Sequence, residues 1–150
     1  MNINDKMPTI RLQNQTGDTV DIAKAYKGRK VLVFFYPKAD TPGCTAQACG
    51  LRDIAGDVGD TVIIGISPDK PSKLAKFDEK YSLGFDLLAD EDHAVAEAFG
   101  VWTEKSMYGR KYMGIQRSAF LIDEKGRIER AWPKISPKDT PIELLNALAR

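Results

Sequence analysis

The sequence predicts an α/β fold in which a central mixed sheet has helices on both faces and a hairpin at its amino end. Three patterns predict it. Apolar runs alternate with amphipathic segments through the middle of the chain, as in parallel strands joined by right-handed helical crossovers. One pair of alternating segments near each end flanks a Gly-containing turn and predicts a hairpin. The length of 150 residues fits one domain over 1–150.

The amino-terminal hairpin comes first along the chain. Ile10 and Leu12 alternate with polar residues, and so do Val20 and Ile22. The turn between them contains Gly17. We therefore expect two short antiparallel strands at the start of the fold.

Strands and helices alternate in the middle of the chain. The run 30–36 is rich in Val and Phe and predicts a buried strand that Pro37 ends. A helix is predicted from Pro42 to Val58, because Thr41 suits the N-cap and proline suits the first helical position. The other expected elements are a strand over 61–66, a helix over 71–81, a strand over 85–88 and a short helix around 95–99.

The last third of the chain has one irregular stretch. Residues 101–116 contain aromatic and Met side chains without a regular period, which predicts a loop. Segments 118–123 and 127–132 predict a hairpin. The capping-box signature Thr140-Pro-Ile-Glu143 predicts a final helix, with an apolar stripe of Ile142, Leu145 and Ala149. This order of elements is compatible with a thioredoxin-like sandwich.

Charge and hydropathy exclude several classes of protein. Lys and Arg number 22 against 21 Asp and Glu, a net charge of +1. We therefore expect neither a nucleic-acid partner nor binding to an anionic membrane surface. The run 31–36 is far too short to span a bilayer. Residues 1–13 lack a secretory signal, so a cytoplasmic location is expected. An organelle protein that had lost its targeting segment would look the same.

Cys44 and Cys49 are the two cysteines of the chain. Taken alone, their C-x4-C spacing favours two inert buried thiols, since free Cys is among the most buried residue types. A metal site is not expected, because His93 is the single histidine and no further soft ligands are present. The C-x-x-C pair of dithiol oxidoreductases is absent. We expect no cofactor.

The position of Cys44 argues against an inert thiol. If Thr41 is the N-cap, Cys44 lies in the first helical turn, where unpaired amides and the helix dipole stabilise a thiolate, the reactive form. The amides of Gly43 and Cys44 could hold a peroxide oxygen. Thr41 has a hydroxyl that could either cap the helix or contact the peroxide, and Pro37 would shield the sulfur from water.

The spacing of the two cysteines has a mechanical consequence. On an ideal helix their Cα atoms would lie roughly 8.6 Å apart, beyond the roughly 7 Å limit for a disulfide. The first turns must therefore unwind before Cys44 and Cys49 can bridge. Gly50 and Gly56 weaken the predicted helix by about 1 kcal/mol each.

Several segments resemble a known family. Pro37-x-x-x-Thr41-x-x-Cys44 resembles the active-site signature of the peroxiredoxins. Segments 35–53, 65–69 and 101–123 are similar to the bacterioferritin-comigratory or Q-type subfamily. The resemblance implies a thioredoxin-like fold and reduction of hydrogen peroxide and organic hydroperoxides. It also implies Cys44 as the peroxidatic thiol, Cys49 as the resolving thiol, Pro37 and Thr41 as pocket residues, thioredoxin as reductant, and a monomer or sometimes a dimer.

The resemblance also implies a role for Arg117, which matches an arginine that faces the thiolate. One position departs from the family pattern: Gln47 stands where Glu is frequent, so the arginine can gain a hydrogen bond there but no ion pair. Trp102 and Tyr108 could wall the pocket or simply pack a loop. His93 is expected to start a helix.

Two alternatives to an enzyme remain open at this point. A redox sensor would use the same reactive thiol without turnover. A structural module would keep both cysteines inert.

Overall fold

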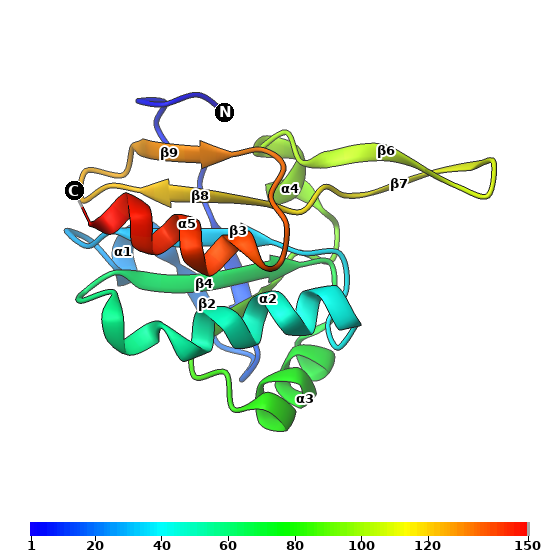
Figure 1. Ribbon diagram of the computed structural model, residues 1–150, viewed down its shortest axis with the longest axis horizontal. Helices are drawn as coiled ribbons and strands as arrows, with labels where there is room; N and C mark the ends of the chain where they lie inside the picture. Colours follow the sequence, from blue (N-terminus) through cyan, green and yellow to red (C-terminus); the bar gives the residue numbers. More distant parts are fainter. Residues whose placement is uncertain (150) are drawn as a thin grey trace.

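The computed structural model describes residues 1–149 and has a seven-stranded mixed sheet in the order β2-β1-β5-β4-β3-β8-β9 (Figure 1). Strands β3, β4 and β5 are parallel, and the other neighbours pair antiparallel. Both predicted hairpins are confirmed. The strands are β1 (Arg11–Asn14), β2 (Thr19–Asp21), β3 (Val31–Phe35), β4 (Val62–Ser67), β5 (Asp86–Ala89), β8 (Ser118–Ile122) and β9 (Ile128–Trp132).

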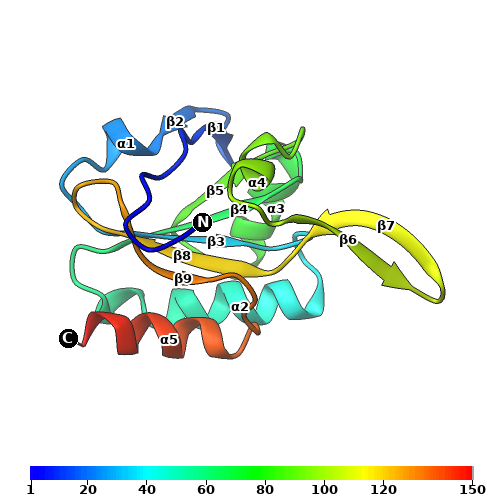
Figure 2. The same ribbon diagram turned by 90° about the horizontal axis from the view of Figure 1, so that it is seen from above.

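Helices cover both faces of this sheet (Figure 2). The helices α2, α3 and α5 share one hydrophobic cluster with the sheet, and α1 and α4 share a second cluster on the opposite face. The predicted α/β sandwich is confirmed. The helices are α1 (Ile22–Ala25), α2 (Pro42–Asp53), α3 (Pro71–Tyr81), α4 (Ala94–Ala98) and α5 (Asp139–Leu148), and a 3₁₀ turn, η1, covers Ala55–Asp57.

Strand β3, which lies between β4 and β8 inside the sheet, is buried along its whole length. Its alternate side chains divide between the two clusters, and Phe34 and Tyr36 face α2 and α3. Gly65 of β4 makes room for these rings, because a Cβ there would lie 2.7 Å from Phe34 Cζ and 3.0 Å from Tyr36 Cε1. The packing of Phe34 and Tyr36, directly before Pro37, therefore depends on the absence of a side chain at Gly65.

The predicted loop over 101–116 is wrong. Strands β6 (Trp102–Met107) and β7 (Arg110–Ile115) form a two-stranded arm that projects beyond the sheet (Figures 1 and 2). Most of its side chains are exposed, so the apolar alternation of a half-buried strand is missing. Tyr108 and Gly109 both have positive φ, as a two-residue hairpin turn requires.

Two helix ends also differ from the prediction. The helix α2 ends at Asp53 instead of Val58, and the 3₁₀ turn η1 follows it, so Gly56 lies outside the helix. Gly56 and its neighbours Asp57 and Val58 are poor helix formers, which explains the early end. The second difference lies after β2, where Ile22 begins the short helix α1 instead of ending a strand.

The last helix begins by a different device from the predicted capping box. Its N-cap is Lys138, and no side chain caps it. Glu143 instead accepts a hydrogen bond from Trp132. The buried face also differs: Thr140 points into the core with Leu144 and Ala147, while the predicted stripe residue Ile142 is 49% exposed.

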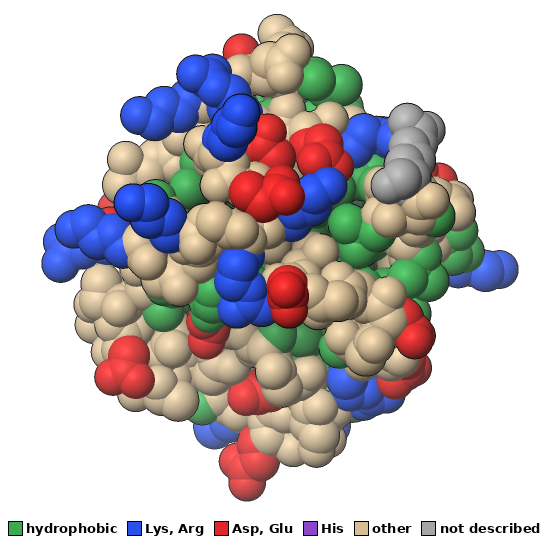
Figure 3. All heavy atoms as spheres, turned by 90° about the vertical axis from the view of Figure 1, so that its left-hand side faces the viewer, with side chains coloured by type: hydrophobic (Ala, Val, Ile, Leu, Met, Phe, Trp, Pro, Cys, Tyr) green, Lys and Arg blue, Asp and Glu red, His purple; other side chains and the backbone are tan. Residues whose placement is uncertain are grey.

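The surface carries charges of both signs. Figure 3 shows the end of the molecule opposite the β6–β7 arm, where acidic and basic side chains lie interspersed. None of the helices in residues 1–149 has the length and apolar character needed to cross a membrane.

We expect Gly65→Ala to lower the free energy of unfolding by about 1–3 kcal/mol, because the added methyl group overpacks two aromatic rings. Urea denaturation measures the loss. Gly56→Ala is the matched control, since no atom lies within 4 Å of the place that its new methyl group would take and its φ is not positive; its effect should stay below about 1 kcal/mol. Equal losses in the two variants would contradict the overpacking at Gly65.

Candidate active site

Cys44 lies where β3 passes into α2. The predicted N-cap Thr41 is confirmed, Pro42 occupies the first helical position, and Cys44 falls in the first turn. Because β3 is one of the three parallel strands and Cys44 follows its carboxyl end, this turn lies at the carboxyl edge of the parallel strands, where α/β folds place their sites. Cys44 is 1% exposed, and its sulfur is a free thiol.

The backbone amides around this sulfur are unpaired. The first helical hydrogen bond runs from the Thr45 amide to the Thr41 carbonyl, at 2.8 Å. Among residues 1–149 no group accepts a hydrogen bond from the amides of Gly43 or Cys44. The Thr41 hydroxyl does not cap the helix but donates to the Lys38 carbonyl, at 2.8 Å. Two N–H donors are therefore left beside the sulfur.

Arg117 brings a cation to the same place. Its Nη2 lies 3.3 Å from Cys44 Sγ, and its Nη1 donates to Gln47 Oε1 at 2.7 Å. The residue precedes β8, and its carbonyl accepts a hydrogen bond from the Ile135 amide, which fixes its backbone. Gly43 permits this approach, because a Cβ there would lie 3.1 Å from Arg117 Nη2.

The charge of Arg117 has no carboxylate partner. None of the ion pairs formed within residues 1–149 includes it, and Gln47 is neutral and 0% exposed. Attraction between charges is stronger where water is excluded. The half-buried guanidinium of Arg117 is thus a cation without a carboxylate partner that directly contacts the sulfur of Cys44.

The segment between β3 and α2 is anchored to neighbouring elements. Its Ala39 amide donates to Asp69 at 2.7 Å. Asp40, with φ of 59°, accepts from the Tyr81 hydroxyl at 2.8 Å and pairs with Lys80 at 3.0 Å. These contacts hold the pKa of the Asp40 carboxyl below its usual range. Pro37 lies half-buried in this anchored segment.

Cys49 is the second thiol of α2. It is free and half-buried, and it packs against the cluster that contains Cys44. Both cysteines lie in one continuous helix, which agrees with the expectation that they are separated while the helix is intact.

The arm and α4 contain the other residues considered from the sequence. His93 is the N-cap of α4, as predicted, and its ring stacks on Trp102 at 3.9 Å between centroids. Tyr108 is 99% exposed at the tip of the arm, so the suggestion that it walls the pocket is wrong.

Three residues near the site were not predicted from the sequence. The Tyr36 hydroxyl is buried, no group in residues 1–149 pairs with it, and burial raises its pKa. Lys105 of β6 lies within electrostatic reach of Arg117, and burial and that charge lower its pKa. Thr140 of α5 contacts Gln47. Of the three, only Tyr36 lies next to the active-site signature in the sequence, where it directly precedes Pro37.

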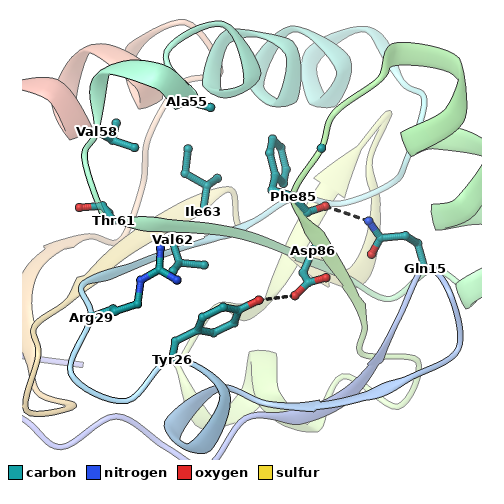
Figure 4. Close-up of a pocket in the computed structure, with 11 residues that line it drawn as sticks. Gln15, Tyr26, Arg29, Ala55, Val58, Thr61, Val62, Ile63, Phe85 and Asp86 are labelled. Atoms are coloured by element: carbon teal, nitrogen blue, oxygen red, sulfur yellow. Dashed lines mark hydrogen bonds between the residues drawn. The ribbon is translucent and has the colours of Figure 1, made fainter.

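A separate hollow lies at the opposite edge of the sheet (Figure 4). It is lined around the starts of β4 and β5, whereas Cys44 follows the carboxyl end of β3. Its Tyr26 hydroxyl donates to Asp86 at 2.6 Å, and burial together with that carboxylate raises the pKa of Tyr26 to about 12. It contains no cysteine. Within the described chain no cluster of three potential metal ligands occurs.

Known proteins share this sequence and this fold. The AhpC/TSA family matches residues 3–131. Peroxiredoxin Bcp of Bacillus subtilis is 47% identical over 97% of this chain and 94% of its own. Among solved structures, a Xylella fastidiosa PrxQ mutant has a TM-score of 0.92 at 28% identity, covering 99% of this chain and 96% of that one.

A third relative has been solved with a trapped intermediate and ligand. The bacterioferritin comigratory protein of Xanthomonas campestris, studied for its alkyl peroxide reduction activity, has a TM-score of 0.86 at 32% identity, over 93% of this chain and 90% of that one. The chain therefore belongs to the AhpC/TSA family, within its Bcp and peroxiredoxin Q group of thiol-dependent peroxidases.

Proposed function

We propose that Cys44 is the thiol that attacks the peroxide and that Cys49 is the thiol that resolves the product. The observation that carries this proposal is the 3.3 Å contact between Cys44 Sγ and Arg117 Nη2 in the first turn of α2. Cys49 has no such cation at hydrogen-bond distance among residues 1–149. The two thiols therefore differ in the stabilisation that a thiolate would receive.

In the first step the Cys44 thiolate attacks one oxygen of the peroxide. A sulfur–oxygen bond forms as the O–O bond breaks, and the departing oxygen takes up one proton from solvent, which gives a sulfenic acid and releases water from hydrogen peroxide or an alcohol from a hydroperoxide. Negative charge develops on the departing oxygen. The unpaired amides of Gly43 and Cys44 and the remaining donors of Arg117 lie beside the sulfur to stabilise it.

In the second step Cys49 attacks the sulfenic acid and expels water, which leaves a Cys44–Cys49 disulfide. Both residues lie in α2, and an intact helix would hold their Cα atoms roughly 8.6 Å apart. The start of α2 must unwind, which breaks the contacts of Gln47 with Arg117 and Thr140. Gly50 lowers the cost of unwinding.

The third step returns the disulfide to two thiols by exchange with an external dithiol. We propose thioredoxin or a similar protein as that reductant, and hydrogen peroxide and organic hydroperoxides as substrates. The alkyl peroxide reduction activity of the Xanthomonas campestris relative supports the organic substrates. An assay of peroxide-dependent NADPH consumption with thioredoxin and thioredoxin reductase tests the complete cycle. Oxidation of Cys44 without sustained turnover would indicate a sensor instead.

We expect Cys44→Ser to abolish turnover in this assay, because a serine hydroxyl is not ionised near neutral pH and cannot attack the O–O bond. The variant should remain folded, since the exchange removes little volume. Thermal unfolding of the two proteins checks this. Sustained NADPH consumption by the serine variant would refute the assignment of Cys44.

We expect Cys49→Ser to keep the first reaction with peroxide and to lose the internal disulfide. Cys44 should consume about one equivalent of peroxide per chain and remain as a sulfenic acid without a disulfide partner. Intact-mass measurement and non-reducing peptide mapping after one equivalent of peroxide read out both results. A variant that no longer consumes the first equivalent would give Cys49 a different role.

We expect Arg117→Lys to slow the reaction of Cys44 with peroxide by about 10- to 100-fold, the effect of losing a hydrogen bond between charged groups. A single ammonium cannot bond Cys44 and Gln47 with the separated donors of a guanidinium. Stopped-flow measurement of Cys44 oxidation gives the rate. Arg130→Lys on β9 is the control and should leave the rate unchanged, whereas equal rates for wild type and Arg117→Lys would remove Arg117 from the mechanism.

A further inference from the structure

Gln47 occupies a demanding position, because it is fully buried beside a cation. Arg117 has only donors, so the amide must present Oε1 to it. The Nε2 group then points the other way and needs an acceptor, since a buried donor without a partner is destabilising. Whatever accepts that hydrogen bond therefore decides the orientation of Gln47.

Thr140 is that acceptor. Its Oγ1 lies 2.9 Å from Gln47 Nε2 and also donates to the Ser136 carbonyl at 2.9 Å. A hydroxyl has one proton. Because the backbone carbonyl takes it, the hydroxyl can only accept from Gln47. Thr140 is 1% exposed, and its neighbours on the buried face of α5 are Leu144 and Ala147.

The hydrogen bonds form one directed chain from the backbone to the sulfur. The Ser136 carbonyl accepts from Thr140, Thr140 accepts from Gln47, Gln47 accepts from Arg117, and Arg117 donates its other Nη to Cys44. Each link of the chain therefore has one donating and one accepting group. The chain contains no carboxylate, so the charge of Arg117 is not neutralised along it.

We propose that Thr140 is a positioning residue for the reactive thiol, which acts by fixing the Gln47 amide and, through it, the guanidinium of Arg117 against Cys44. The proposal rests on the proposed role of Cys44. The arrangement also requires a residue at position 47 that can donate a hydrogen bond to Thr140, as glutamine does. A carboxylate there would have no proton to donate, so the Thr140 hydroxyl would have to turn toward it and leave the Ser136 carbonyl unpaired.

Other ionisable groups lie near Cys44 on the elements packed around it. Arg117 precedes β8, Lys105 lies on β6 and Tyr36 follows β3. Within residues 1–149 none of them is hydrogen-bonded to Thr140. A change at Thr140 therefore reaches the sulfur through Gln47 and Arg117, and it leaves the other two groups in place.

The test compares Thr140→Val with Thr140→Ser in a Cys49→Ser background, where Cys44 is the only thiol. The measured quantity is the rate of alkylation by iodoacetamide from about pH 4 to 9, which follows the thiolate fraction. We expect the valine variant to react about 3- to 10-fold more slowly at neutral pH, the effect of one hydrogen bond, with its pH profile displaced to higher pH. The serine variant should match the parent, because it keeps the hydroxyl.

Each outcome decides the proposal. An unchanged pH profile in a folded valine variant would overturn it. Equal slowing in the serine variant would assign the effect to the lost methyl group and overturn it as well. If thermal unfolding shows that Thr140→Val is unstable, Thr140→Ala removes the same hydroxyl without a branched replacement and must give the same displacement. Alkylation needs no peroxide, so failure of the parent to react with peroxide would reject the proposed function and leave this test intact.

Discussion

The contact between the Arg117 guanidinium and the Cys44 sulfur is the interaction around which this end of the molecule is arranged. A cation in a half-buried place needs an anion or several acceptors, and Arg117 has one neutral amide and one thiol. The buried strand β3 delivers Cys44 to the sheet edge, and the missing side chain of Gly43 lets the guanidinium approach. The fold thus places the cation of Arg117 against the sulfur that we propose as the nucleophile.

The same helix must hold the thiol and later release it. The first turns of α2 are attached through Gln47 to Arg117 and Thr140 and, further along, by close packing of Gly50 against Pro141. Cys44 and Ala48 also pack into the core of this face, but both side chains are small, and each hydrogen bond is worth only about 1 kcal/mol. Local unwinding is therefore within reach without loss of the sheet, which carries most of the buried core.

Sequence patterns predicted the sheet and the place of Cys44, because buried strands and helix starts leave local signals. They failed at the arm, where side chains exposed on both faces remove the alternation that marks a strand. They also failed at Thr140, which reads as a capping residue in sequence yet points into the core. Its partner Gln47 lies 93 positions away, and no local pattern reports a hydrogen bond over that distance.

Glutamine at position 47 changes what oxidation does to the helix. A glutamate would keep Arg117 paired whatever the state of the sulfur. With the neutral amide, the guanidinium loses its only nearby anion when the thiolate becomes a protonated sulfenic acid, since none of the ion pairs within residues 1–149 includes Arg117. An uncompensated charge in a half-buried place destabilises the closed arrangement. In the proposed cycle, oxidation of Cys44 therefore weakens the contacts that keep Cys49 away.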